Sequence, residues 1–271
     1  MAARPLDILQ GLPRVDRILG VSYSGRSPDV WRAIETVRAN GAEVALVTAG
    51  RVADTVRNDP DIRVIQYGTS ESGHGRRLER GFISFTGTVA PVALIVTAVE
   101  GVDAARDVLF GSGDVSSEAG AYGRALSEVC GNEEGGLAVI ASYWAAPAMD
   151  DIESKFVEGS LAPIVCHDAK DFSHGRFVSI SSDHALSQGV LLLGVGGETS
   201  YDQLLFDTLR RELDQVYLLK SRNEGALGAL ELLVAVQQFA VEFALEKGFD
   251  ISRPGEIAAP WSRLYRWDGQ L

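Results

Sequence analysis

The chain has 271 residues with a formal net charge of −12, and 46% of its residues are hydrophobic. These values are typical of a globular protein with one or two domains, since a domain usually holds about 100–200 residues. The acidic balance argues against non-specific binding of nucleic acid, which depends on excess lysine and arginine. It also disfavours binding to an anionic membrane surface.

Short apolar runs typical of strands alternate with helical patterns along the whole chain. This alternation predicts an α/β fold in which helices cover both faces of parallel sheets. The polar, glycine-rich stretch 130–136 is the best boundary, so we expect one unit over 1–130 and a second over 131–271. Strands are expected over 15–22, 43–49, 62–68, 137–142, 163–167, 189–195 and 215–220, and helices over 28–40, 88–110, 115–130, 145–159, 200–213 and 225–248.

The longest apolar segment lies within 225–248 and is interrupted by glutamates and glutamines. This pattern favours a buried helix over a membrane span, and we expect its burial to need a partner subunit, hence a homodimer. The first residues lack the features of a signal peptide. Cys130 and Cys166 show no metal or disulfide spacing, and His167 and His184 have no metal partners in the sequence. We therefore expect a cytoplasmic protein with free thiols, structural histidines and no metal or cofactor.

Two segments repeat the order strand, small-residue loop, helix and strand. They are "GVSYSGRSPDVWRAIETVRANGAEVALVT" and "LGVGGETSYDQLLFDTLRRELDQVYLLKS", and they align at an offset of 172 residues. The first loop keeps its hydroxyl groups, whereas the second has Gly194 and Gly196 in place of two serines. The offset indicates two copies of one α/β unit.

The stretch "VSYSGRSPDV", residues 21–30, joins an expected strand to an expected helix. Serine hydroxyls and backbone N–H groups at a helix N-terminus suit an anion, and Gly25 would let a ligand approach the backbone closely. Alternatively, Ser27 caps the helix ahead of Pro28 and the other serines only form the turn. A P-loop is excluded, because no GxxxxGK[ST] pattern follows the strand.

This loop resembles that of the sugar isomerase (SIS) family, which reads S-x-S-G-x-[ST]-x-[DE] before a helix. The resemblance implies that the loop holds the phosphate of a phosphosugar. The segment "GFISFTGTVAPVAL" is similar to a family segment that approaches the sugar, which implies this role for Ser84. The phosphate-loop positions that match are Ser22, Ser24, Gly25 and Ser27, with Asp29 at the acidic position.

The segment "DIESKFVEGSLAPIVCHDAKDFSHGRFVSI" resembles the second SIS unit of the isomerase domain of glucosamine-6-phosphate synthase. Asp151, Lys155 and Glu158 share one helical face, which we expect to meet either water, as a solvated salt-bridge stripe, or a cleft. The resemblance implies that Glu158 is the base of an aldose–ketose isomerisation and that His174 helps to open the sugar ring. It also implies that Lys155 positions the anionic ligand and that the histidine enters from a neighbouring subunit.

The chain departs from the family pattern in both units. Only about fourteen residues precede Val15, so we expect the first unit to lack an N-terminal strand and loop, which were lost, removed or are supplied by a partner chain. In the second unit, "ASYWAAPAMD" places Tyr143 and Trp144 where a glycine-rich turn is expected.

Three functional hypotheses remain open. The first is a phosphosugar isomerase, or a related deglycase or deaminase-like enzyme, that acts through Glu158. The second is a phosphosugar-binding or sensing protein without catalysis. The third is a dinucleotide enzyme that uses "GVGGET", residues 194–199, although Thr199 stands where the fingerprint needs glycine or alanine and no acidic residue ends the next strand.

Overall fold

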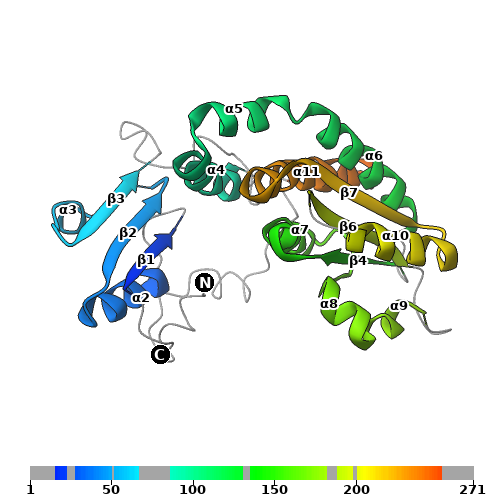
Figure 1. The fold of residues 1–271 in the computed structure, drawn as a ribbon, viewed down its shortest axis with the longest axis horizontal. Helices are drawn as coiled ribbons and strands as arrows, with labels where there is room; N and C mark the ends of the chain where they lie inside the picture. Colours follow the sequence, from blue (N-terminus) through cyan, green and yellow to red (C-terminus); the bar gives the residue numbers. More distant parts are fainter. Residues whose placement is uncertain are drawn as a thin grey trace. The chain divides into compact units, whose positions relative to one another are not determined.

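The computed structural model describes residues 16–22, 28–50, 52–66, 86–130, 135–181, 188–197 and 200–251 (Figure 1). These residues form two parallel sheets with flanking helices, which confirms the predicted α/β class. The chain divides into two compact units within helix α4 (Thr86–Glu100), between Pro91 and Val92. Each unit is described separately below.

The first unit holds a parallel sheet in the order β1-β2-β3, formed by β1 (Arg17–Val21), β2 (Glu43–Thr48) and β3 (Ile62–Gln66). Helices α2 (Pro28–Ala39) and α3 (Asp54–Arg57) pack on one face of it. Alternate strand residues point to that face, so the apolar core consists of one residue in two along each strand. This core includes Ile34, Val37, Val44, Leu46 and Ile62.

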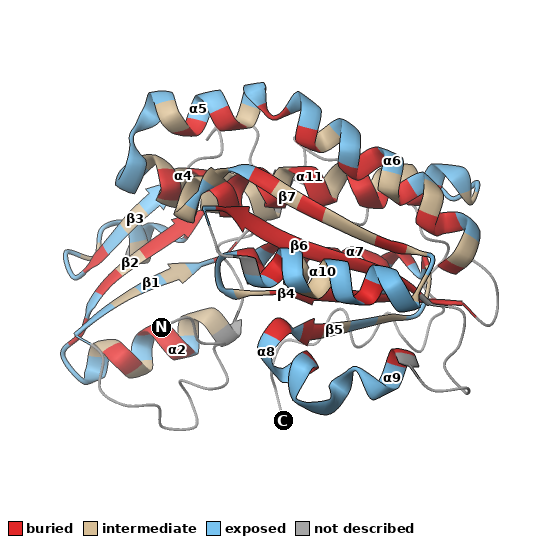
Figure 2. Ribbon diagram, turned by 45° about the vertical axis from the view of Figure 1, so that its right-hand side comes forward, coloured by how far each residue is buried: buried red, intermediate tan, exposed pale blue. Residues whose placement is uncertain are grey.

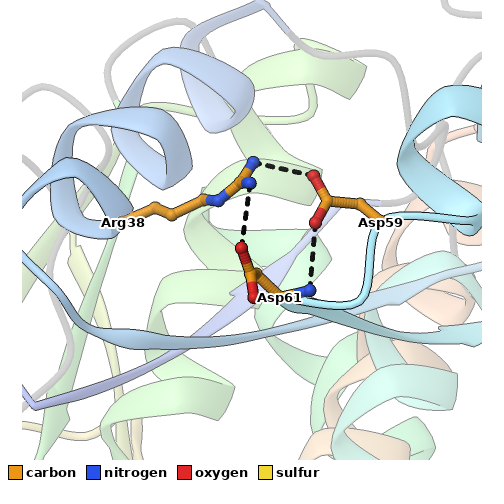
Figure 3. A network of polar contacts seen from close by, with 3 residues as sticks. All are labelled: Arg38, Asp59 and Asp61. Carbon is orange, nitrogen blue, oxygen red and sulfur yellow. Dashed lines mark hydrogen bonds and ion pairs between the residues drawn. The ribbon is translucent and has the colours of Figure 1, made fainter.

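An ion-pair network ties the end of α2 to the loop before β3 (Figure 3). The guanidinium of Arg38 pairs with Asp59 at 2.8 Å and with Asp61 at 3.2 Å. The backbone N–H of Asp61 in turn donates to the Asp59 carboxylate at 3.0 Å. The positive charge in the last turn of α2 also complements the negative end of the helix dipole.

The second unit holds a parallel sheet in the order β5-β4-β6-β7. Its strands are β4 (Gly136–Ala141), β5 (Ile164–Asp168), β6 (Gln188–Gly196) and β7 (Val216–Glu224). The central strands β4 and β6 are buried over nearly their whole length (Figure 2). Continuous burial of this kind is typical of a parallel sheet with helices on both faces.

Two groups of helices cover this second sheet. On one face lie α6 (Gly113–Cys130), α7 (Ala146–Gly159) and α11 (Gly225–Glu246), and α5 (Val102–Gly111) packs against α11. On the opposite face lie α10 (Ser200–Glu212) and the segment of α8 (Ala169–Asp171), η4 (Phe172–Arg176) and α9 (Val178–Ser181). Residues that alternate along β4 point to the two faces in turn.

Helix α11 is the apolar segment that sequence analysis assigned to a buried helix. It is long and apolar enough to cross a membrane, but 61% of its apolar window is buried within the chain. Phe239 and Phe243 pack on Phe156 of α7, with ring centroids 6.0 and 4.8 Å from it. The core-helix interpretation is therefore confirmed. Because α11 is buried by its own chain, its apolar surface gives no reason to expect a homodimer, which stays a prediction.

All seven predicted strands and the predicted helices are present, with one difference in the helices. The single helix expected over 88–110 is wrong, because α4 ends at Glu100 and α5 begins at Val102. Gly101 separates them with φ +96°, a left-handed conformation that glycine adopts without a steric penalty. The short helices α3, α8 and α9, together with η3 (Tyr143–Ala145) and η4, were not predicted.

The predicted internal repeat agrees with the positions of the helices and strands. Helix α2 begins at residue 28 and α10 at residue 200, which is the predicted offset of 172 residues. In each unit the strand before this helix pairs in parallel with the strand after it, as β1 with β2 and β6 with β7. The compact second unit begins before the predicted boundary because α5 and α6 pack on α11. The boundary of the repeats at 130/131 stays a prediction.

The contact between α6 and α11 depends on a glycine, which allows a stability test. A Cβ atom at Gly123 would lie 2.4 Å from the carbonyl oxygen of Phe239, whereas a Cβ at Gly111 would meet nothing within 4 Å. We expect Gly123→Ala to lower the free energy of unfolding by about 1–3 kcal/mol through overpacking. Gly111→Ala should leave it unchanged or raise it by up to about 1 kcal/mol through helix propensity. Urea unfolding followed by circular dichroism measures both, and equal stabilities would contradict the close contact.

Candidate functional site

Ser22 lies immediately after β1, at the carboxyl edge of the first sheet. Its side chain is buried, and its backbone N–H donates to the carbonyl oxygen of Val47 at 3.0 Å, which extends the β1–β2 ladder. The register of this ladder places Ser22 beside Thr48, the last residue of β2. The Thr48 side chain is also buried, and its hydroxyl accepts from the N–H of Gly50 at 3.1 Å. Two buried hydroxyl groups therefore lie on adjacent strand ends.

Sequence reasoning named Ser22 but not Thr48. The signal was a polar residue that closes an apolar strand next to another strand end, and only the register shows that the two are neighbours. Ser24, Gly25, Ser27 and Ser84 lie outside the residues that the structure describes. Their predicted contacts with a phosphosugar stay predictions.

Asp151 and Lys155 form a buried ion pair between α7 and α11. The Nζ atom of Lys155 lies 3.0 Å from Oδ1 of Asp151, and the side-chain amide of Gln237 on α11 donates to Oδ2. The two residues are only 2% and 6% exposed, Lys155 and Asp151 respectively. The expectation that this helical face meets water or a cleft is therefore wrong for both residues, because α11 covers them. The predicted role of Lys155 toward a ligand stays a prediction, and it would require this ammonium group to leave Asp151.

Glu158, the third member of the same predicted face, is exposed. Its carboxylate accepts from the Ser154 hydroxyl, one turn earlier in α7, at 3.0 Å. Helix α7 runs back from the carboxyl end of β4 to the amino end of β5, and these strands are parallel. Glu158, in the last turn of α7, therefore lies near the amino edge of the second sheet.

His174 lies in a different part of the second unit. It is exposed and sits in η4, where Gly175 adopts φ +133° and kinks the backbone. The segment α8–η4–α9 packs on the face of the sheet opposite to α7. Within the second unit, the structure does not bring Glu158 and His174 together. The predicted arrangement in which the histidine enters from a neighbouring subunit stays a prediction.

At the carboxyl edge of the second sheet, Ser142 and Asp202 form a contact that sequence analysis did not identify. The Ser142 hydroxyl, just after β4, donates to Oδ1 of Asp202 in α10 at 3.0 Å. Oδ2 of Asp202 is buried and has no hydrogen-bond partner among the described residues. Burial raises the pKa of Asp202, against the smaller opposite effects of the Ser142 hydrogen bond and the Lys220 charge. The carboxylate thus occupies the position above β6 that a ligand would need.

The glycines of "GVGGET" are explained by packing within the chain. A Cβ at Gly194 would lie 2.8 Å from Oδ2 of Asp202, and one at Gly196 would lie 2.6 Å from the carbonyl oxygen of Asn223. The N–H of Gly196 donates to the Ser221 hydroxyl at 2.9 Å. Small residues are therefore required here whether or not a phosphate binds, which counts against the dinucleotide-enzyme hypothesis.

Glu231 is a second buried carboxylate that the sequence did not mark. From the first turns of α11, its Oε2 accepts from the N–H groups of Arg222 and Asn223 and from the side-chain amide of Asn223, at 2.9–3.1 Å. Three hydrogen bonds satisfy a charge that is otherwise costly to bury. Glu231 therefore holds the end of β7 against the start of α11.

His167 at the end of β5 is buried, and its ring lies 5.6 Å from that of Phe172. Neither ring nitrogen has a hydrogen-bond partner within the described part of the chain. Burial, with a smaller effect of the Arg176 charge, lowers the pKa of this histidine. The surroundings are those of a neutral side chain that packs in the core, in line with the structural role expected for it.

Comparisons with known proteins place this architecture among sugar-phosphate enzymes of known structure. No family model matches the chain, and no curated protein matches its sequence. The tagatose-6-phosphate ketose/aldose isomerase from Escherichia coli superposes with a TM-score of 0.71 at 18% identity, over 95% of this chain and 77% of that one. Glucosamine-6-phosphate deaminase from Thermotoga maritima and the C-terminal domain of glucosamine-fructose-6-phosphate aminotransferase from Francisella tularensis each give 0.65 at 12% identity, over 92% of this chain and 77% of theirs. At these identities the likeness concerns the fold.

The buried ion pair can be tested by removing one charge and then both. Lys155→Met leaves the Asp151 carboxylate buried without its ammonium partner, so we expect the free energy of unfolding to fall by about 3–5 kcal/mol. The double variant Asp151→Asn/Lys155→Met removes the charge and keeps an acceptor for Gln237, and it should recover most of this loss. Urea denaturation measures both variants. A single variant as stable as the wild type would show that the pair is not buried in solution.

The environment of His167 predicts a pH-dependent stability. Its folded-state pKa lies below the ordinary value of 6.5, so the unfolded chain binds the proton first and stability is lost as the pH falls below about 6.5. His167→Phe should remove this loss and, by removing two unpaired buried nitrogens, raise the free energy of unfolding by about 1–3 kcal/mol. Melting temperatures between pH 5 and pH 8 measure the effect. The control His174→Phe, at an exposed position, should follow the wild-type pH profile.

Proposed function

We propose that this chain, which has an SIS-type fold, binds a sugar phosphate through the hydroxyl-bearing loop at residues 22–27. The observation that carries the proposal is the position of Ser22, buried at the carboxyl end of β1 beside Thr48 and directly before the loop that leads to α2. Open α/β sheets bind their ligands at this edge of the strands. Ser22, Ser24, Gly25 and Ser27 would surround the phosphate, and Ser84 would approach the sugar.

Neutral donors suit a phosphate in this acidic chain. Hydroxyl and backbone N–H groups satisfy phosphate oxygens without a buried lysine, and the positive end of the α2 dipole adds a favourable field. Helix α2 is twelve residues long, which is sufficient for such a dipole. The structural neighbours named above are described as acting on tagatose 6-phosphate and glucosamine 6-phosphate, which supports a phosphorylated hexose or hexosamine as the ligand class.

For the reaction, we propose that Glu158 transfers the proton between adjacent carbons of the open-chain sugar, as in an aldose–ketose isomerase or a deaminase-like enzyme. Its exposed carboxylate is free to meet a ligand, in contrast to Asp151 in the same helix. His174 would assist ring opening from the second subunit of a cytoplasmic homodimer, because within one chain it lies on the other face of the second sheet. No cofactor is required for this chemistry.

A second candidate function is phosphosugar binding without catalysis. The separation of Glu158 from His174, and the ion pair that holds the Lys155 ammonium on Asp151, favour this alternative. It would use the same loop, so ligand binding alone does not separate the two functions.

Ligand binding is tested by a thermal-shift panel of hexose, hexosamine and pentose phosphates. A ligand at about 100 times its Kd should stabilise the folded chain by about 2.7 kcal/mol. We expect one sugar phosphate to raise the melting temperature of the wild type and not that of Ser24→Ala. Ser117→Ala, which changes an exposed serine of α6, is the matched control and should respond like the wild type. A panel without any shift would contradict the proposed ligand class.

Catalysis is then tested on the sugar phosphate that binds. Glu158→Gln should lower turnover by about 10²–10⁴-fold, the usual contribution of a general base, with ligand affinity retained. Glu153→Gln, an exposed glutamate of the same helix, is the control and should retain full turnover. Binding without turnover in the wild type would favour the sensing function.

A further inference from the structure

The outer edge of β1 has no neighbouring strand among the described residues. Strand β1 pairs with β2 alone, in the register Arg17↔Glu43 to Val21↔Val47. Its hydrogen bonds to β2 include the N–H of Ser22 to Val47 and the carbonyl oxygen of Asp16 to the N–H of Glu43. In a parallel pair the bonding residues alternate, so the even-numbered residues 16–22 bond to β2. The N–H and carbonyl groups of Arg17, Leu19 and Val21 therefore point to the open edge.

The side chains of the same residues are apolar and exposed. Leu19 and Val21 are each 45% exposed, although both lie in a strand that leads into the proposed ligand loop. An edge with free backbone groups and exposed apolar side chains is a template for the addition of another strand.

The second unit shows what covers the equivalent edge. At the offset of 172 residues, Leu19 and Val21 correspond to Leu191 and Leu193 of β6, which are 0% and 1% exposed. Strand β4 pairs in parallel with β6 along this edge, and α7, which follows β4, packs on the same face. The two units thus keep the same apolar positions, and only the second covers them within its described residues.

We propose that the outer edge of β1 receives a parallel strand of the β4 type, carried by a polypeptide segment outside the 271 residues of this sequence. The register of β4 on β6 predicts the pairing: a strand of about five small or apolar residues would lie opposite Arg17–Val21. By analogy with Ser142 after β4, the residue that follows this strand would lie beside Ser22. The proposal concerns strand pairing and does not depend on which ligand the chain binds.

Residues 6–12, the apolar run just before β1, do not suit this role. Only residues 13–16 separate them from Arg17, whereas parallel strands require a crossover of about a dozen residues or more. The comparisons are consistent with an additional segment, because this chain covers 77% of each of the three structures described above and leaves more than a fifth of them unmatched.

Amide hydrogen exchange of the free chain, followed by NMR, provides the first test. Because the N–H groups of Gly20 and Ser22 bond to β2, they should exchange slowly, whereas those of Leu19 and Val21 should exchange rapidly. Slow exchange at Leu19 and Val21 in a monomeric sample would show that the chain's own residues already cover the edge, and this would overturn the proposal. Slow exchange that depends on protein concentration would identify a second copy as the occupant, with the same consequence.

The second test adds a strand to the edge. The probe is a fluorescent peptide with the sequence of residues 136–142, flanked by lysines for solubility, at about 0.15 M salt to limit attraction to the acidic chain. We expect binding that slows exchange at Leu19 and Val21. The same peptide with proline in place of its central valine should not bind, because proline cannot donate to the ladder.

Two protein variants show where the peptide binds. Leu19→Lys places a charge on the proposed edge and should weaken binding by about tenfold or more, whereas Ile65→Lys, an exposed position on the opposite edge strand β3, should change it less than about twofold. Equal effects of the two variants, equal binding of the proline peptide, or no binding of the valine peptide would overturn the proposal.

Discussion

The burial of α11 between the second sheet and helices α6 and α7 is the contact on which the second unit depends. Twelve of its residues are buried, and the backbone of Phe239 comes so close to α6 that only a glycine fits at residue 123. Because protein interiors are close-packed, this contact determines which side chains of the neighbouring helices point inward. The charged groups of the second unit are arranged around it.

Two charged clusters show this effect. Lys155 and Asp151 neutralise each other where α7 meets α11, and Glu231 satisfies the backbone at the turn from β7 into α11. These residues would be prominent candidates for chemistry if they lined a cleft. The structure instead uses them to bury polar groups at the ends and edges of an apolar helix. Glu158, one turn beyond Lys155, escapes this packing and keeps an exposed carboxylate.

The two units use related strands and helices with different degrees of cover. In the second unit, Asp202 fills the space above Gly194, and the central strands are buried on both faces. In the first unit, the equivalent strand β1 ends in a buried serine and has exposed leucine and valine side chains along its edge. The first unit therefore keeps the hydroxyl groups suited to an anion, while the second has replaced them with packing of its own carboxylate. This division is the physical basis for placing the proposed ligand at Ser22.

The sequence by itself determined the α/β class, the order of strands and helices and the 172-residue repeat, because these follow from local periodicity and from residues such as Ser22 that end a strand. It also identified α11 as a core helix, since its polar interruptions are spaced for burial. Only the tertiary structure decided that Asp151 and Lys155 face α11, that Glu158 and His174 lie on opposite faces of a sheet, and that Thr48 and Asp202 lie at the strand ends. These facts depend on which helix covers which face and on strand register, and both are set by contacts between residues far apart in the chain.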